Sequence, residues 1–168
     1  MRVEVVESHI ENQAVPDALS DAAVDRALKN FFAAVTSDDS LFIAESSGVT
    51  IGSDSRDGQK VCSGTFTVRF REERQASSRA FHFSLIEKLS ELLKAAGSSE
   101  SLDIVLCLVP EKSKVDKASA LALWMRLGAS GSSEEQAGLR WGLGLAHLQQ
   151  ALLFLSRYLR QQIGQSGD

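Results

Sequence analysis

The chain has 168 residues, of which 43% are hydrophobic and 24% are charged. This composition excludes an intrinsically disordered chain, and a chain of this length can bury about 70% of its extended surface without a disulfide or a structural metal. The formal net charge of −4 argues against a general polyanion-binding role. We therefore expect one soluble domain over residues 1–168, and we expect it to hold no cofactor; the order of the elements predicted below makes it an α+β domain.

The beginning of the chain predicts a strand. Valines at positions 3, 5 and 6 have β-branched side chains, and the charges of Arg2, Glu4 and Glu7 break any apolar segment of the kind that marks a secretory signal. Cys62 and Cys107 lie far apart and have no closely spaced partner, which predicts buried free thiols and no metal. Both observations favour a cytoplasmic location.

A helix and a hairpin are expected next. After Pro16, apolar residues recur at helical spacing as far as Val35. Residues 40–53 are rich in β-branched and aromatic residues and lead to Asp57-Gly58, a pair that favours a turn with positive φ. From Gly64 to Arg71 apolar and polar residues alternate, so Phe66, Val68 and Phe70 are predicted on one buried face of a strand, and Thr65, Thr67, Arg69 and Arg71 on the other.

The middle of the chain predicts strand, helix, strand and helix. A short strand is expected at 79–83 with Phe81 and Phe83 on one face, followed by a helix from the capping-box pair Ser84 and Glu87 to Gly97. The largely apolar residues 102–110 show no alternation, which predicts a strand covered on both faces. A second capping-box pair, Ser113 and Asp116, predicts a helix to Gly128, followed by a flexible link over 129–133.

These elements predict a mainly antiparallel sheet with helices packed on it and a long C-terminal amphipathic helix over 133–163. The strand at 102–110 between two predicted helices leaves a mixed sheet open. One side of the last helix carries an apolar arc typical of a core-facing helix: Trp141, Leu145, Leu148, Ala151, Leu152, Leu155, Tyr158 and Leu159. Gln149, Ser156 and Arg160 are expected on the opposite side.

The last helix also has a second, thinner apolar stripe, which includes Leu139, Leu143, Leu153 and Phe154 beside Arg157. Two interpretations stay open: the fold covers both sides of the helix, or the stripe is a surface for another protein or for self-association. Arginine, histidine and glutamine along the helix exclude a membrane span. Gly138, Gly142 and Gly144 predict either a break at 138–144 or close approach of another backbone.

No motif in the sequence carries a decisive catalytic signature. The three histidines fall in different predicted elements and form no metal-binding pair, and the glycines lack the spacing of a phosphate-binding loop. His82 is expected on the outer sheet face with Arg69 and Arg71, where the three could anchor a small ligand. Glu72 and Glu73 interrupt the nearby arginines and no aromatic residues are expected to face outward, so nucleic-acid binding is not expected.

The resulting hypothesis is a non-enzymatic protein-protein interaction module, that is, a chaperone-like protein, an adaptor or a regulatory subunit. Its predicted contact residues are Leu139, Leu143, Leu153, Phe154 and Arg157, and its partner is another protein or a second copy of the chain. The alternative is an enzyme or small-molecule-binding protein with a pocket between sheet and helices. In that alternative His82, Arg69 and Arg71 hold the ligand.

Overall fold

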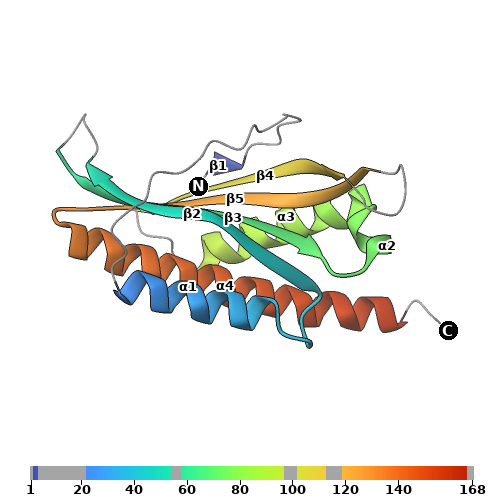
Figure 1. Ribbon diagram of the computed structural model, residues 1–168. Helices are drawn as coiled ribbons and strands as arrows, with labels where there is room; N and C mark the ends of the chain where they lie inside the picture. The colour runs from blue at the N-terminus through green and yellow to red at the C-terminus, as the bar shows by residue number, and fades with distance from the viewer. Residues whose placement is uncertain (1, 4–21, 54–57, 97–101, 113–118, 166–168) are drawn as a thin grey trace.

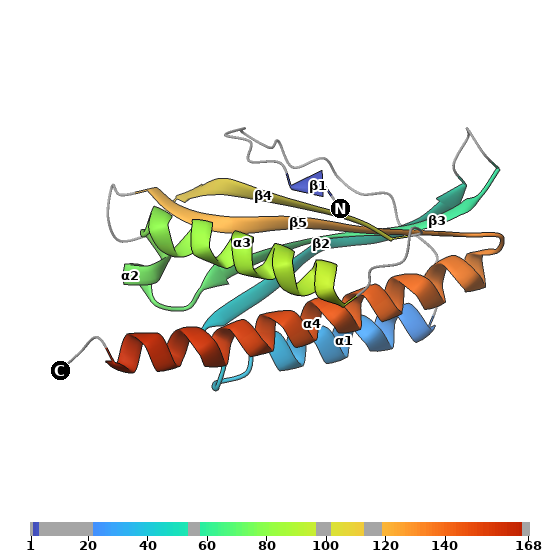
Figure 2. The ribbon, with the colours of Figure 1, turned by 180° about the vertical axis from the view of Figure 1, so that it is seen from behind.

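The computed structural model describes residues 2–3, 22–53, 58–96, 102–112 and 119–165. In chain order its elements are β1 (Arg2–Val3), α1 (Ala22–Val35), β2 (Phe42–Ser53), β3 (Lys60–Phe70), α2 (Glu73–Ala76), α3 (Arg79–Ala95), β4 (Leu102–Lys112), β5 (Ser119–Gly131) and α4 (Glu134–Gln165). The strands form one sheet in the order β1-β4-β5-β3-β2, and α1, α3 and α4 pack on the same side of it (Figures 1 and 2). The four long strands are antiparallel and the short β1 is parallel to β4. The predicted α+β class is therefore confirmed.

The predicted hairpin is formed by β2 and β3, which pair from Phe42 opposite Phe70 to Ser53 opposite Lys60. Gly58 has a φ of 66°, the positive value that the sequence predicts. Alternate residues of β3, from Cys62 to Phe70, are buried against the helices, whereas the residues between them are only partly buried. The predicted alternation of faces is confirmed.

The helix predicted up to Gly128 is wrong, because the described residues from Ser119 to Gly131 form β5. Alanine, leucine and methionine favour helices, but this segment lies between β3 and β4 and makes hydrogen bonds to both. Leu123, Met125, Leu127 and Ala129 then alternate into the core. The capping pair Ser113 and Asp116 lies outside the described residues, and of the predicted link 129–133 only Ser132 and Ser133 lie between β5 and α4.

The strand predicted at 79–83 is also wrong, because α3 already begins at Arg79. Its N-cap is Ser78, whose Oγ accepts a hydrogen bond from the Phe81 amide, so Ser84 lies inside the helix and caps nothing. The short Phe-His-Phe alternation fits one turn of a helix as well as it fits a strand. As a result Phe81 is half-buried and Phe83 is exposed, instead of sharing a buried face.

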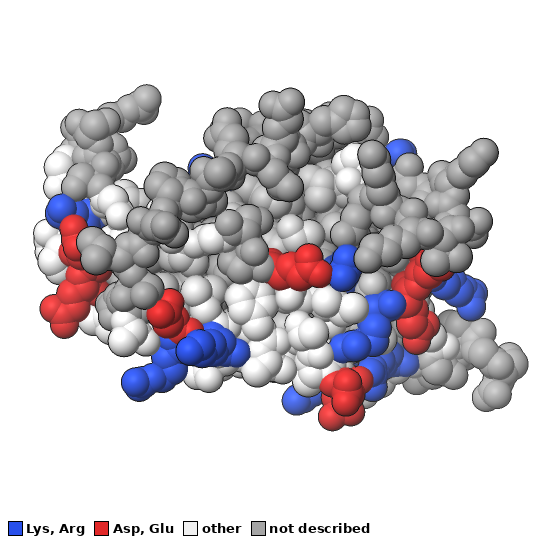
Figure 3. Space-filling view, in the orientation of Figure 1, with Lys and Arg blue, Asp and Glu red and all other residues white. Residues whose placement is uncertain are grey.

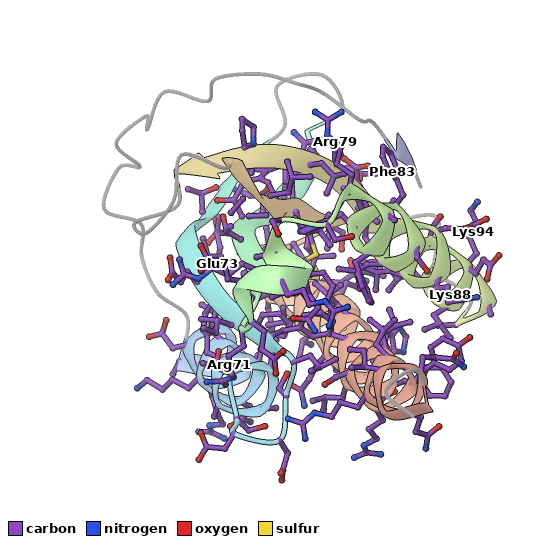
Figure 4. The ribbon with its side chains drawn as sticks, turned by 90° about the vertical axis from the view of Figure 1, so that its right-hand side faces the viewer. Arg71, Glu73, Arg79, Phe83, Lys88 and Lys94 are labelled. Atoms are coloured by element: carbon purple, nitrogen blue, oxygen red, sulfur yellow. The ribbon has the colours of Figure 1, made fainter. Side chains whose placement is uncertain are left out.

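One hydrophobic core lies between the sheet and the helices. From α1, the predicted helix, Val24, Phe31 and Val35 enter it, and the Phe31 ring lies 5.4 Å from that of Phe66 in β3. Helix α4 occupies the centre of the helical layer, where it contacts both α1 and α3 (Figure 4). This position gives α4 an inner face against the sheet and an outer face away from it.

Helix α4 continues through 138–144 without a break, which excludes one of the two alternatives that its glycines left open. A Cβ at position 144 would lie 3.0 Å from Leu102 Cδ2 and 3.1 Å from Leu127 Cδ1, which shows that Gly144 lets the helix lie close to the sheet. A Cβ at position 142 would meet nothing within 4 Å. The two glycines therefore have different roles although they are two residues apart.

We expect Gly142→Ala to raise the free energy of unfolding by about 1 kcal/mol, because alanine restricts the unfolded chain and favours the helix at an open position. Gly144→Ala has the same intrinsic advantage, but it must displace Leu102 and Leu127. Chemical denaturation of the two variants checks this difference. Equal stabilisation by both substitutions would contradict the close packing at Gly144.

Candidate functional site

The beginning of α4 is held by side chains of the short connection from β5. Ser133 Oγ accepts a hydrogen bond from the Gln136 amide, and Gln136 Oε1 accepts one from the Ser132 amide. Glu134 and Glu135 place negative charge in the first turn, which the helix dipole favours. These contacts start the helix at a defined position directly after the sheet.

Side-chain hydrogen bonds anchor α4 near both of its ends. The Trp141 indole is fully buried, and its Nε1 donates a hydrogen bond of 2.9 Å to the carbonyl oxygen of Leu127 in β5. Ser156 Oγ accepts one of 2.8 Å from the Leu41 amide, and Arg160 donates to the carbonyl oxygen of Asp38. The helix of 32 residues, about 48 Å long, is thus attached to β5 near its beginning and to the connection between α1 and β2 near its end.

The predicted core arc of α4 is confirmed. The prediction that Ser156 lies on the opposite, exposed side is wrong. Trp141, Leu145, Leu148, Ala151, Leu152, Leu155 and Leu159 are buried, and Tyr158 is half-buried beneath the Lys88 ammonium, which lies 5.6 Å from the ring centroid. Ser156 is 1% exposed, because it satisfies the Leu41 amide where β2 begins. A long-range hydrogen bond of this kind has no signal in the local sequence.

The outer face of α4 carries an exposed stripe of apolar side chains. Leu139 is 64% exposed, Leu143 58% and Phe154 56%. The exposed Ala146 and Gln150 lie between them at helical spacing, Leu153 beside Phe154 is half-buried, and Arg157 is exposed at the far end. We call the exposed set the α4 stripe; its members are Leu139, Leu143, Ala146, Gln150, Phe154 and Arg157.

Among the residues that the structure describes, no element covers the α4 stripe. Helices α1 and α3 flank α4 (Figures 2 and 4), and the side chains of Leu139, Leu143 and Phe154 on its outer face stay more than half exposed. Phe83, the other large apolar side chain that is strongly exposed in the described residues, lies on α3 and points away from α4 (Figure 4). The stripe is therefore a separate surface, and the exposure of its leucines and phenylalanine needs its own explanation.

The three residues of the alternative ligand site lie apart. His82 is 1% exposed, with Nδ1 2.9 Å from the carbonyl oxygen of Ser78 and Nε2 2.8 Å from that of Leu121. Its predicted place on the outer sheet face is wrong, because α3 turns the ring into the core beside Phe70. His82 thus joins the α3 N-terminus to β5.

The two arginines of that alternative are engaged within the fold. Arg69 forms an ion pair of 2.8 Å with Glu45 across the β2–β3 ladder. Arg71 donates to the carbonyl oxygens of Thr36, Ser37 and Ser40, where positive charge suits the end of α1 (Figure 4). The described structure brings neither arginine to His82, so no observation there favours a shared ligand site.

The charged side chains visible in the described part of the structure are of mixed sign. On the face shown in Figure 3, acidic and basic groups lie close to one another. Two cross-strand pairs show the same pattern, Arg69 with Glu45 and Arg126 with Asp103. Within the described ranges, no group of three or more histidine, cysteine or acidic side chains could hold a metal ion, and no helix is long and apolar enough to cross a membrane.

Comparisons of the chain with protein-family models, with curated proteins and with solved structures give no match. The function is therefore inferred from the geometry of the chain itself.

Proposed function

We propose that this protein is a protein-protein interaction module that binds its partner through the α4 stripe and acts without catalysis, as a chaperone-like protein, an adaptor or a regulatory subunit in the cytoplasm. The observation that carries the proposal is the exposure of Leu139, Leu143 and Phe154 on one face of a helix whose other face is fully packed. Aromatic and aliphatic side chains on a rigid helix are typical anchors of protein interfaces.

The rigidity of α4 supports this function energetically. Association has to offset the loss of translational freedom and of side-chain freedom at the contact surface. Because Trp141 fixes α4 to β5, and Ser156 and Arg160 fix it to the connection between α1 and β2, the backbone of the stripe is ordered before a partner arrives. A surface of this kind loses less conformational entropy on binding than a flexible segment does.

The double substitution Leu143→Glu/Phe154→Glu tests the proposal. We expect the free energy of unfolding to change by less than about 1 kcal/mol, because both side chains are already exposed. Partner affinity should fall at least about tenfold, because two charges would be buried in an apolar contact. The measurement is photo-crosslinking in the native cell from a benzoylphenylalanine at position 139, with and without the two substitutions, followed by mass spectrometry.

Phe83 offers a matched control. Phe154→Glu and Phe83→Glu make the same chemical change at side chains of similar exposure, 56% and 51%, on different helices. Only the α4 variant is expected to lose the crosslinked product. If neither Phe154→Glu nor the double variant changes the product, or if position 139 yields none, the α4 stripe is not the binding surface.

A further inference from the structure

We propose that the α4 stripe pairs with the same stripe of a second copy of the chain, with the two α4 helices antiparallel about a two-fold axis at Ala146. This inference rests on the proposed function and specifies its partner. It follows from how apolar, small and charged side chains are distributed along the outer face of α4.

The charges at the two ends of the outer face are of opposite sign. Glu135 is exposed in the first turn of α4 and Arg157 is exposed near its other end, on the same face of the helix as Leu139. In a parallel pair each charge would face its own copy and repel it. In an antiparallel pair Glu135 of each copy faces the partner's Arg157, so both ends of the interface become complementary.

The apolar residues are compatible with the same register. Ala146 lies midway between Glu135 and Arg157 in the sequence. When Glu135 of each copy faces Arg157 of the other, the two-fold axis therefore passes through Ala146. Leu139 of one copy then faces Leu153 and Phe154 of the other, and the reverse contact is identical, as two-fold symmetry requires. The register that satisfies the charges therefore also brings Leu139 against Leu153 and Phe154, whereas Leu143 faces Gln149 and Gln150 beside the axis.

The centre of the stripe permits close approach. Ala146 is exposed and has only a methyl group, and on its N-terminal side a Cβ at Gly142 would meet nothing within 4 Å. Small residues at a crossing point allow two helices to approach closely, so that the larger residues on either side can interdigitate. A larger apolar residue at the axis would hold the helices apart.

The first test is the oligomeric state of the full chain by sedimentation equilibrium over a range of protein concentrations. We expect a monomer–dimer equilibrium for the unmodified protein. Glu135→Arg and Arg157→Glu should each raise the dimer dissociation constant about tenfold, since each replaces two attractions by two repulsions. The double exchange Glu135→Arg/Arg157→Glu should restore it, which a parallel pair or a structural effect of either residue does not predict.

The second test places a cysteine at the axis. Ala146→Cys should form a disulfide between two copies under mild oxidation, because the two thiols face each other. Ala80→Cys, at an exposed alanine of α3, is the matched control and should remain a monomer on a non-reducing gel. Both variants carry the same buried native thiols, Cys62 and Cys107.

A protein that is monomeric at every concentration, or a dimer that neither charge substitution weakens, would overturn the self-pairing. In that case photo-crosslinking from position 139 separates the two proposals. A product with a different protein, lost in Leu143→Glu/Phe154→Glu, rejects the second copy and keeps the binding surface. The absence of any such product rejects both.

Discussion

Trp141→Ala is expected to lower the free energy of unfolding by about 3–5 kcal/mol, the largest effect of a single substitution that we expect in this chain. The indole is fully buried between α4 and the sheet, 6.0 Å from the Phe66 ring, and alanine would leave a cavity there. The substitution also removes the donor of the hydrogen bond to Leu127, whose carbonyl oxygen would then lose a buried partner. Urea denaturation followed by circular dichroism measures the change.

Trp124 provides the control for Trp141. It lies on β5 opposite Cys107 and Thr67, with its side chain on the sheet face away from α4 and only partly buried. Trp124→Ala is expected to cost clearly less stability, because a partly exposed side chain loses less transfer free energy and leaves no closed cavity. Equal losses for the two tryptophans would mean that Trp141 does not anchor α4.

Gly64→Ala is expected to destabilise the protein by about 1–3 kcal/mol, although it adds only one methyl group. A Cβ at position 64 would lie 2.6 Å from Trp141 Cζ2, closer than carbon atoms pack, and 3.1 Å from Val49 Cγ2, which is a tight contact. The indole would have to move, and its hydrogen bond to Leu127 fixes where it lies. The same urea denaturation measures the loss.

A double-mutant cycle connects the two sites. Trp141→Leu shortens the side chain that meets position 64, so Gly64→Ala should cost less in the Trp141→Leu background than in the unmodified protein. The coupling isolates the contact between Gly64 and the indole from any general effect of alanine in β3. Strictly additive losses would show that the cost of Gly64→Ala arises elsewhere.

Some elements could be read from the sequence because their periodic pattern is long. The apolar residues of α1 and α4 recur at helical spacing over several turns, and the alternation in β3 covers nearly the whole strand. The second stripe of α4 was visible in the same way, since Leu139, Leu143 and Phe154 fall outside the core arc. Whether that stripe is covered or exposed stayed open in the sequence, and the structure shows Leu139, Leu143 and Phe154 to be exposed.

Other features depend on residues that are distant in sequence. The segment from Ser119 to Gly131 has helix-forming residues, yet it is a central strand because β3 and β4 supply hydrogen bonds on both sides. His82 is buried because the Leu121 carbonyl oxygen meets its ring, and Ser156 because the Leu41 amide does. None of these partners can be recognised from the neighbouring sequence.

The local sequence by itself determined where this chain alternates or repeats, and therefore which faces of α1, β3 and α4 are apolar. Only the tertiary structure decided that the segment before α4 is a strand, and that the sheet, α1 and α3 cover one side of α4 and leave the other accessible. The physical reason is that periodicity reports the geometry of one element, whereas strand pairing and burial depend on contacts between elements.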